Sequence, residues 1–552
     1  MKQVLAKYFP RYTRLGPLAL TALFIAVLML LPMLVIIGTT FTGSLDVWRH
    51  LFETVLWDYI SDSLLLMLGV GAGVLIIGVP SAWLVSVCNF PGRKFFTWAL
   101  LLPLAMPAYI IAYTYTGLLD FAGPVQSFLR DIAGWGYEGH WFFNVRSLPG
   151  AIIMLSLVLY PYVYLLARAA FLDQSPSILE VGRTMGYGSR FGMIRLALPM
   201  ARPAIVTGLT LALMETLADY GTVQYFGVST FTTGIFRTFY GFGDAAAAAQ
   251  LASVLLGFVL LLMALERYSR RRARYHTVKG RTIRRITLTK GWATVAAWFC
   301  ALPLLFGFFI PAGQLLYWSL FEAVIGDSFA MLAWNSFYLA FIAALIAVSC
   351  ALVLAYAKRS YERKKIVRAA VTVSGTGYAL PGTIIAIGVL IAFAWLDHHL
   401  IDLAESWFDI DIGLLLSGTL VALLFAYTVR FLAVSLGSIE SGLEKIKLNV
   451  DHSAQLLGHK PFQVLQKIHL PLLRGSVLTA FLIVFVDVLK ELPATLILRP
   501  FNFNTLAVRA YELASDERLI DAAPASLLIV LVGLLPVILL SRSITLSNKQ
   551  NK

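Results

Sequence analysis

The chain has 552 residues, of which 59% are hydrophobic and only 13% are charged, and its formal net charge is +14. A soluble protein of this size would carry roughly a quarter charged residues. The apolar residues recur along the whole chain in blocks of about 20, the length that crosses a bilayer core as a helix. The composition therefore excludes a large soluble protein and predicts an all-α polytopic membrane protein.

Twelve membrane spans are predicted in chain order. The first six are 17–41, 61–86, 96–119, 149–172, 202–222 and 246–265, and the next six are 292–320, 332–357, 367–396, 412–436, 473–492 and 522–541. The first span is too long for a signal peptide and is followed by further spans. The three cysteines, Cys88, Cys300 and Cys350, are scattered in or beside apolar segments, which predicts packing rather than a disulfide framework or a metal motif.

Positive charge predicts the orientation of the spans, because Lys and Arg accumulate in cytoplasmic loops. With the N-terminus inside, the inner segments hold 34 Lys and Arg and the outer segments hold 7. This split predicts that both termini lie inside. The basic run ERYSRRRARYHTVKGRTIRRITLTK, which begins at Glu266, is then an inner linker beside an anionic membrane surface. Nucleic acid is not expected as a partner.

The two halves of the chain form a repeat. The segment EVGRTMGYGSRFGMIRLALPMARPAI begins at Glu180, and HSAQLLGHKPFQVLQKIHLPLLRGSV begins at His452. At this offset of 272, the register continues through the pairs Glu215/Asp487, Asp219/Glu491, Thr233/Thr505, Arg237/Arg509 and Asp244/Asp516. Such self-similarity predicts two six-helix repeats, 1–275 and 276–552. Both copies start on the inner side, so the repeats are related by a pseudo-two-fold axis along the membrane normal.

Each repeat carries a polar inner loop between its fourth and fifth spans. The pattern predicts a helical segment, a glycine that permits a sharp turn, and a second helix that ends at Leu-Pro. Two equivalent loops imply two equivalent soluble partners, each of which takes a short helix into a groove. The candidate coupling residues are Glu180, Gly186, Leu198, Pro199, His452, Gly458, Leu470 and Pro471.

This loop resembles the EAA loop of binding-protein-dependent ABC importer permeases. The first copy keeps Glu180 and Gly186, whereas the second keeps Gly458 but has His452 in place of the glutamate, preceded by Asp451. The stretches LADYGTVQYFGVSTFTTGIFRTFYGFGDAAAAAQLA and ATLILRPFNFNTLAVRAYELASDERLIDAA are similar to the fused, two-repeat permeases of ferric iron importers. Fused permeases for thiamine and for phosphonates share the same plan and are the alternatives.

The resemblance implies a type I ABC importer permease fold in a bacterial inner membrane. It implies two copies of a cytosolic ABC ATPase as partners, and a periplasmic or lipid-anchored substrate-binding protein. The chain itself contains no G-x-x-x-x-G-K-[ST] sequence, so ATP and Mg²⁺ are expected only on the partner subunits, and the chain is not expected to be an enzyme. The rival from another class is a secondary transporter with 12 spans, driven by an ion gradient.

Four acids occupy equivalent positions near the outer ends of the two fifth spans. Glu215 and Asp219 in one repeat, and Asp487 and Glu491 in the other, are spaced i, i+4, which predicts one helix face for each pair. Carboxylate and phenolate oxygens suit a hard cation. The four acids, with Tyr220 and Tyr225, are therefore the predicted substrate pathway and a transient metal station. The alternative is solvation or structural salt bridges.

Two further outer features are candidates for binding. The segment LDHHLIDLAESWFDIDI carries Asp397, Asp402, Glu405, Asp409 and Asp411 without any Lys or Arg, and it is interpreted as a metal site, a basic partner's docking site or a solvated face. Arg237 and Arg509 match across the repeats, which predicts either contacts with acids on a binding protein or anchoring at the membrane interface.

Overall fold

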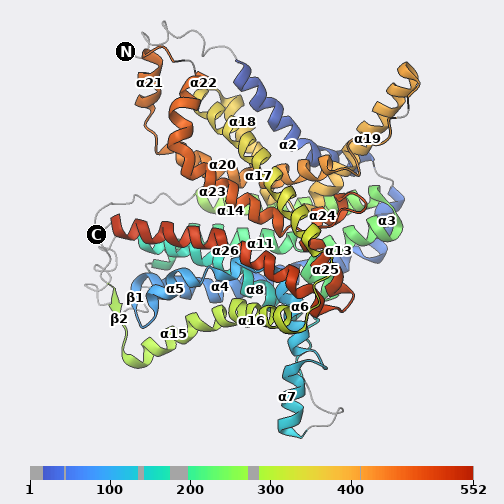
Figure 1. The fold of residues 1–552 in the computed structure, drawn as a ribbon. Helices are drawn as coiled ribbons and strands as arrows, with labels where there is room; N and C mark the ends of the chain where they lie inside the picture. The colour runs from blue at the N-terminus through green and yellow to red at the C-terminus, as the bar shows by residue number, and fades with distance from the viewer. Residues whose placement is uncertain are drawn as a thin grey trace. The chain divides into compact units, whose positions relative to one another are not determined.

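The fold is taken from a computed structural model of the chain, which describes residues 16–42, 45–134, 142–173, 195, 197–271, 285–410, 412–459 and 461–550. These residues are almost entirely helical (Figure 1). The described strands are β1 (Cys88–Asn89) and β2 (Ile286–Thr287), which form one short parallel pair. The predicted all-α class is therefore confirmed. The chain divides into two compact units, Met1–Gly43 with Met331–Thr505, and Ser44–Ala330 with Leu506–Lys552.

The first unit consists of one N-terminal helix and a block from the second half of the chain. Its elements are α2 (Pro17–Thr42), α17 (Phe329–Ser360), α18 (Lys365–Ser374), η7 (Gly377–Ala379), α19 (Gly382–Phe408), α20 (Leu420–Glu444), α21 (Leu448–Leu456), α22 (Pro461–Val464), η8 (Leu465–His469), α23 (Leu470–Leu489) and α24 (Pro493–Leu498).

The second unit contains most of the first half and the two C-terminal helices. From the first half come α3 (Leu45–Thr54), α4 (Leu56–Val87), α5 (Arg93–Ala99), η2 (Leu102–Ala105), α6 (Ala108–Leu119), α7 (Pro124–Ala133), α8 (Leu148–Asp173), α11 (Leu198–Ala218), α12 (Gly221–Tyr225), α13 (Phe231–Phe236), η4 (Arg237–Gly241) and α14 (Ala245–Arg271). From the second half come α15 (Lys290–Leu304), η5 (Leu305–Phe309), α16 (Ile310–Tyr317), η6 (Trp318–Glu322), α25 (Leu506–Ser515) and α26 (Leu519–Gln550).

The two units interleave the predicted repeats. Helix α2 begins the first repeat but packs against α18 and α19 of the second (Figure 1). Conversely, α16 and η6 from the start of the second repeat pack against α26 in the unit that holds most of the first. The boundary predicted near 275 divides the chain by sequence order and stays a prediction. In the two compact units, the first span of each repeat belongs to the unit that holds most of the other repeat.

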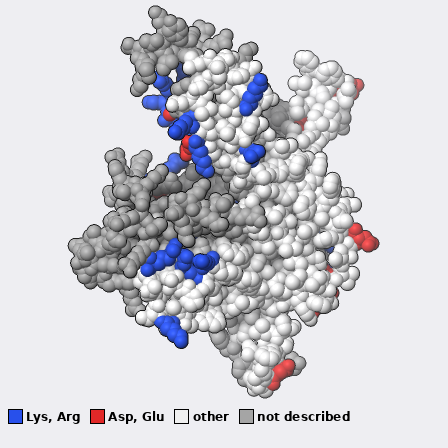
Figure 2. All heavy atoms as spheres, turned by 60° about the vertical axis from the view of Figure 1, so that its left-hand side comes forward, with Lys and Arg blue, Asp and Glu red and all other residues white. Residues whose placement is uncertain are grey.

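Ten helices in the described part of the chain are long and apolar enough to cross a membrane, or eleven if one bent pair counts as a span. These correspond to eleven of the twelve predicted spans. The remaining predicted span, 202–222, is the fifth in chain order and is present as α11. This helix contains Arg202 and Glu215 and is not among the helices counted by apolar character. In the view of Figure 2 most of the described surface is uncharged, and charged side chains occupy a few separate places.

The face of α2 that would meet lipid is distinct from the face that packs. Ala19, Ala22 and Ala26 are at most 4% exposed, whereas Phe24 and Val27 are 64% and 62% exposed. Small residues on the packed face allow close approach of helices in a bilayer, where burial of apolar area between spans provides no driving force. The same arrangement explains Gly388 of α19, where an added Cβ would overlap the carbonyl of Pro32 in α2.

The third predicted span is broken in both repeats. In the first, Arg93–Ala105 and Ala108–Ala133 are bent by 90° at Met106-Pro107. In the second, α18 and η7 end before Pro381, which precedes α19 as Pro107 precedes α6. Proline restricts the preceding residue to extended conformation, and Met106 has a ψ of 111°. The continuous spans predicted at 96–119 and 367–396 are therefore wrong at these two points.

Candidate functional site

The loop between the fourth and fifth spans of the second repeat, predicted to lie inside, has the predicted form of helix, glycine turn and helix. α21 ends at Leu456, and Gly458 adopts a φ of 85°, a left-handed conformation that favours glycine. The amide of His459 donates to the carbonyl of Ala454 at 3.1 Å, which is the outer hydrogen bond of a Schellman motif. An added Cβ at Gly458 would meet nothing within 4 Å, so the glycine is needed for its backbone angle alone.

The second helix of this loop differs from the prediction. It was expected to end at Leu470-Pro471, but α22 continues through η8 directly into α23, with His469 in helical conformation. Proline is tolerated in the first turn of a helical segment, where its missing amide is not needed. Pro199 occupies the same place at the start of α11 after Leu198. The loop is therefore joined rigidly to the fifth span.

Two leucines protrude from the turn of this loop. Leu456 and Leu457 are 82% and 80% exposed, although both are large and apolar. Exposed apolar side chains on a short polar loop mark a surface suited to a protein partner. The side chain of His452 lies outside the described residues, and so do Glu180 and Gly186 of the first loop.

The two outermost acids occupy equivalent structural positions. The Oδ1 atom of Asp219 accepts hydrogen bonds from the amides of Thr222 and Val223, both at 3.1 Å, and its Oδ2 atom accepts from the Thr222 hydroxyl at 2.9 Å. Glu491 accepts from the amides of Ala494 and Thr495, also at 3.1 Å each. Each acid therefore caps the first turn of the short helix that follows its fifth span, α12 or α24.

This capping changes the predicted geometry of the pairs. α11 ends at Ala218, where Asp219 adopts extended backbone angles, and α23 ends at Leu489, before Glu491. The prediction that the two acids of each pair lie on one helix face is therefore wrong. The physical reason is that a carboxylate at this point satisfies the free amides of the next helix, so the chain leaves the fifth span before the second acid.

Within the described part of the chain, Glu491 has a charged partner, whereas Asp219 has none. Arg430 of α20 donates from Nη1 to Oε1 of Glu491 at 2.9 Å, and their side chains are only 11% and 2% exposed. The hydroxyl of Thr495 also contacts Tyr427 at 2.6 Å. An added Cβ at Gly382 would overlap Arg430 Nη1, so the glycine leaves room for this buried pair.

The inner acids of the two pairs also differ from each other. Asp487 forms an ion pair with Lys490 at 2.9 Å. Glu215 is partly buried and has no hydrogen-bond or ion-pair partner in the described part of the chain. The residue that corresponds to Lys490 in the first repeat is Ala218, which supplies no charge. Glu215 is therefore the predicted pathway acid with the most available oxygens.

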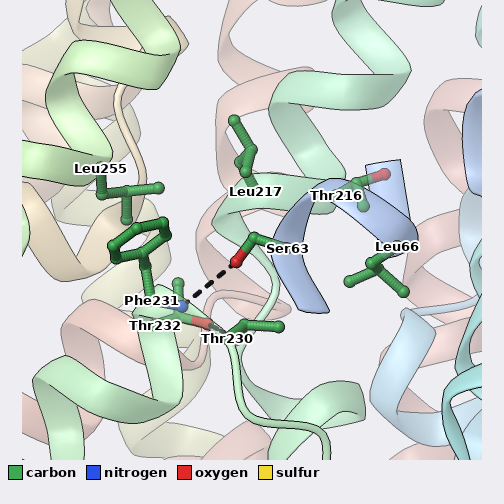
Figure 3. A pocket seen from close by; sticks show the side chains of 8 residues that line it. All are labelled: Ser63, Leu66, Thr216, Leu217, Thr230, Phe231, Thr232 and Leu255. Carbon is green, nitrogen blue, oxygen red and sulfur yellow. Dashed lines mark hydrogen bonds between the residues drawn. The ribbon is translucent and has the colours of Figure 1, made fainter. Parts of the chain in front are cut away.

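A small polar pocket lies beside the capped turn of the first repeat (Figure 3). The hydroxyl-bearing residues Ser63, Thr216, Thr230 and Thr232 line it, together with apolar side chains. It has room for about one water molecule. The Thr232 hydroxyl donates to the backbone carbonyl of Asp219 at 2.7 Å. The Thr232 hydrogen bond thus holds the turn, and the pocket is too small for a substrate.

The two predicted pathway tyrosines have local partners. Tyr220 is buried, stacks on Phe236 with ring centroids 3.7 Å apart, and lies beside Tyr511 with ring centroids 5.8 Å apart. The ring of Tyr225 lies 5.2 Å from the guanidinium carbon of Arg146. These contacts stabilise the packing around the turn. A role in the pathway stays a prediction for both tyrosines.

Arg237 and Arg509, which the sequence predicts to lie outside, have contacts within their own unit. Arg237 interacts electrostatically with Tyr59, and Nη1 of Arg509 lies 3.9 Å from Oε2 of Glu512. Docking of a binding protein at Arg237 and Arg509 stays a prediction.

The acidic segment that is predicted to lie outside is largely helical, because α19 extends to Phe408. Asp397 is 1% exposed and accepts hydrogen bonds from the amides of Leu415, Leu416 and Ser417. This carboxylate therefore holds a turn and is not an available metal ligand. Among the residues that the structure describes, no three His, Cys, Asp or Glu side chains group so as to hold a metal ion. The four-acid station draws on both units and stays a prediction.

The comparison with known families decides the class. The family described as "Binding-protein-dependent transport system inner membrane component" matches residues 10–275 and again 347–550. The chain belongs to this family. It is a fused, two-repeat permease of the ABC importer class, and it is an inner-membrane component of a transport system.

Relatives of this permease include proteins matched over nearly their whole length. The Fe(3+)-transport system permease protein FbpB 2 of Haemophilus influenzae is 28% identical over 544 residues, which cover 95% of this chain and 98% of the relative. The ferric transport system permease protein FbpB of Actinobacillus pleuropneumoniae is 23% identical over 87% of this chain and 70% of its own length. The molybdenum transport system permease protein ModB of Escherichia coli is 26% identical over 36% of this chain and 88% of its own length.

Proposed function

We propose that this permease moves ferric iron across the inner membrane, delivered by a periplasmic or lipid-anchored binding protein and driven by two copies of a cytosolic ABC ATPase. The observation that supports ferric iron as the substrate is the match to a ferric permease over 95% of this chain and 98% of that relative. The molybdenum permease ModB matches 88% of its own length but only 36% of this chain, so its likeness covers about one repeat. Unpaired carboxylates such as Glu215 also favour a cation over an oxyanion.

The second inner loop supports the proposed coupling to an ATPase. Its first helix, α21, ends at Leu456, which is exposed to solvent together with Leu457. After the Gly458 turn, α22 runs through η8 directly into the fifth span. An apolar contact on α21 would therefore move α23 as one body. ATP and Mg²⁺ would be bound by the partner subunits, and the permease would have no ATPase site of its own. The proposed orientation keeps both termini inside.

The proposed pathway for iron uses Glu215, Asp487, Asp219 and Glu491, with different roles. Glu215 and Asp487 would provide oxygens to the ion, and Lys490 would neutralise Asp487 when no ion is present. Asp219 and Glu491 would shape the pathway through their capped turns. A passing cation gains from several shared oxygens, provided that none of the contacts is too tight for release.

Uptake by the reconstituted complex tests this function. Vesicles that contain the permease, its ATPase and its binding protein should accumulate ferric iron with ATP, but not thiamine, phosphonate, molybdate or sulfate. Uptake driven by a proton gradient without an ATPase would instead identify a secondary transporter.

The pathway is tested separately with near-isosteric variants. The double variant Glu215→Gln/Asp487→Asn should abolish iron uptake and leave assembly and basal ATP hydrolysis intact, because only charge is removed. Lys490→Met is the matched control, since it removes the partner of Asp487 but keeps both acids. Uptake by the double variant at the parent rate would show that these carboxylates are not the pathway.

A further inference from the structure

A buried polar cluster fastens the second inner loop to the spans. Asp451 of α21 accepts a hydrogen bond from Arg359 Nε at 2.7 Å through Oδ2, and its Oδ1 lies 2.7 Å from His469 Nε2. The side chains of Arg359, Asp451 and His469 are 10%, 15% and 0% exposed. The ring of Tyr356 packs edge-on against His469, with centroids 5.6 Å apart.

Arg359 joins three helices through a single side chain. It projects from the last turn of α17, and besides Asp451 it donates to the carbonyls of Leu443 and Ile446, at 2.5 and 2.9 Å. These carbonyls lie at the end of α20 and just beyond it. A guanidinium that satisfies three acceptors in fixed directions is a more rigid connection than an ammonium can make. His469 in η8 connects the same carboxylate to α23.

The cluster faces the permease's own spans rather than solvent. Asp451 precedes the position where an EAA-like loop would carry its glutamate, but its charge is already neutralised by Arg359 within this chain. Leu456 and Leu457, in contrast, are exposed on the same loop. The loop therefore has an apolar surface exposed to solvent and an ionic attachment that faces the spans.

The sequence of the first repeat has other residues at the equivalent positions. At the offset of 272 along the chain, Leu179 corresponds to Asp451 and Ala197 corresponds to His469. The helix equivalent to α17 is α4, and its 32 residues contain no Lys or Arg. The structure thus shows this ionic attachment at the second loop, and the sequence of the first repeat does not repeat its residues at the same positions.

We infer that Asp451, Arg359 and His469 are positioning residues that fix the second coupling helix to α17, α20 and α23, so that movement of this helix is passed to the spans. The inference rests on the proposed function, in which α21 contacts an ATPase. It adds that the second loop passes movement to the spans through an ion pair whose residues the first repeat does not carry at the equivalent positions. Loss of the attachment would leave ATPase binding intact while hydrolysis no longer drives transport.

The experiment compares near-isosteric variants of the full permease–ATPase complex. Asp451→Asn removes the charge that Arg359 binds and keeps the shape. Glu440→Gln is the matched control, because it breaks the neighbouring Lys358–Glu440 pair at 2.8 Å, which does not involve α21. The three readouts are ATPase co-purification, ATP hydrolysis, and substrate transported per ATP hydrolysed.

Asp451→Asn should retain the ATPase and its hydrolysis but transport at least about fivefold less substrate per ATP, since it weakens a charge-assisted, largely buried hydrogen bond. Glu440→Gln should stay within about twofold of the parent, as expected for a half-exposed pair. If Asp451→Asn does not assemble, Arg359→Lys and His469→Gln test the same cluster, since both keep a donor but not the full geometry.

If Asp451→Asn, or both alternative variants, transported as much substrate per ATP as the parent, the inference would be overturned and the proposed function would still stand. Loss of the ATPase from Asp451→Asn, with Glu440→Gln unaffected, would also overturn it, because Asp451 would then belong to the docking surface. Failure of the parent permease to retain any ATPase would instead refute the proposed function.

Discussion

The buried Arg430–Glu491 pair allows a quantitative test of what holds the turn after the second repeat's fifth span. Arg430→Met removes one charge of a pair whose side chains are 11% and 2% exposed. Removing one partner of a buried ion pair costs about 3–5 kcal/mol, because the other charge stays buried without compensation. Glu491 would keep its amide hydrogen bonds from Ala494 and Thr495, so the expected loss is near 3 kcal/mol, the lower end of this range.

The double variant Arg430→Met/Glu491→Gln separates charge from shape. Its glutamine oxygen still caps α24, and no buried charge is left unpaired, so the expected loss is only about 1 kcal/mol. Glu491→Gln alone should cost nearly as much as Arg430→Met, since Arg430 is then unpaired. The four proteins form a double-mutant cycle with an interaction energy of at least about 2 kcal/mol.

Reversible unfolding in mixed micelles with increasing SDS content measures these differences. The purified permease is compared in all four forms, with helical content followed by circular dichroism. Additive losses, with an interaction energy below about 0.5 kcal/mol, would refute the reasoning, because the pair would then contribute nothing beyond its separate side chains.

Three further outcomes are expected. Gly458→Ala should strain the backbone at a φ of 85° by about 1–2 kcal/mol and reduce ATPase co-purification, whereas Gly475→Ala, with nothing within 4 Å of the added Cβ, should not. Asp219→Ala should lower stability to thermal unfolding by about 1 kcal/mol, and Asp219→Asn by much less, since asparagine also caps helices. Equal losses of stability in the two variants would contradict the capping role. Gly388→Ala should lower the free energy of unfolding by about 1–3 kcal/mol, because the added Cβ would overlap Pro32. Gly437→Ala, on the exposed surface of α20, should be neutral or stabilising. An unchanged unfolding midpoint for Gly388→Ala would contradict the packing of α2 on α19.

Much of the architecture was predictable because its cause is local. A block of about 20 apolar residues must form a helix in lipid, since no water can satisfy its backbone. In the described residues, ten of the twelve predicted spans correspond to such helices, or eleven if the bent pair counts as one span. The repeat was visible because the two loops keep Gly186 and Gly458 and both Leu-Pro pairs in register. The positive φ of Gly458 then followed from the turn that the pattern required.

The sequence alone did not determine which spans pack together. Every span presents an apolar face, and in a bilayer such faces do not distinguish one neighbour from another. The exchange of α2 into the unit formed by 331–505 depends on the fit of its alanine face and of Pro32 against Gly388. Such complementarity joins positions more than 350 residues apart and leaves no periodic signal in either segment.

The roles of the acids were likewise decided by tertiary structure. Their i, i+4 spacing predicted one helix face, but α11 and α23 end early, and Asp219 and Glu491 cap the helices that follow. Sequence spacing specifies a face only while the helix continues. The same holds for Asp451: its pattern marked an inner loop, but only the fold brought Arg359 and His469 to its two oxygens, because the energy of a buried charge depends on which distant groups surround it.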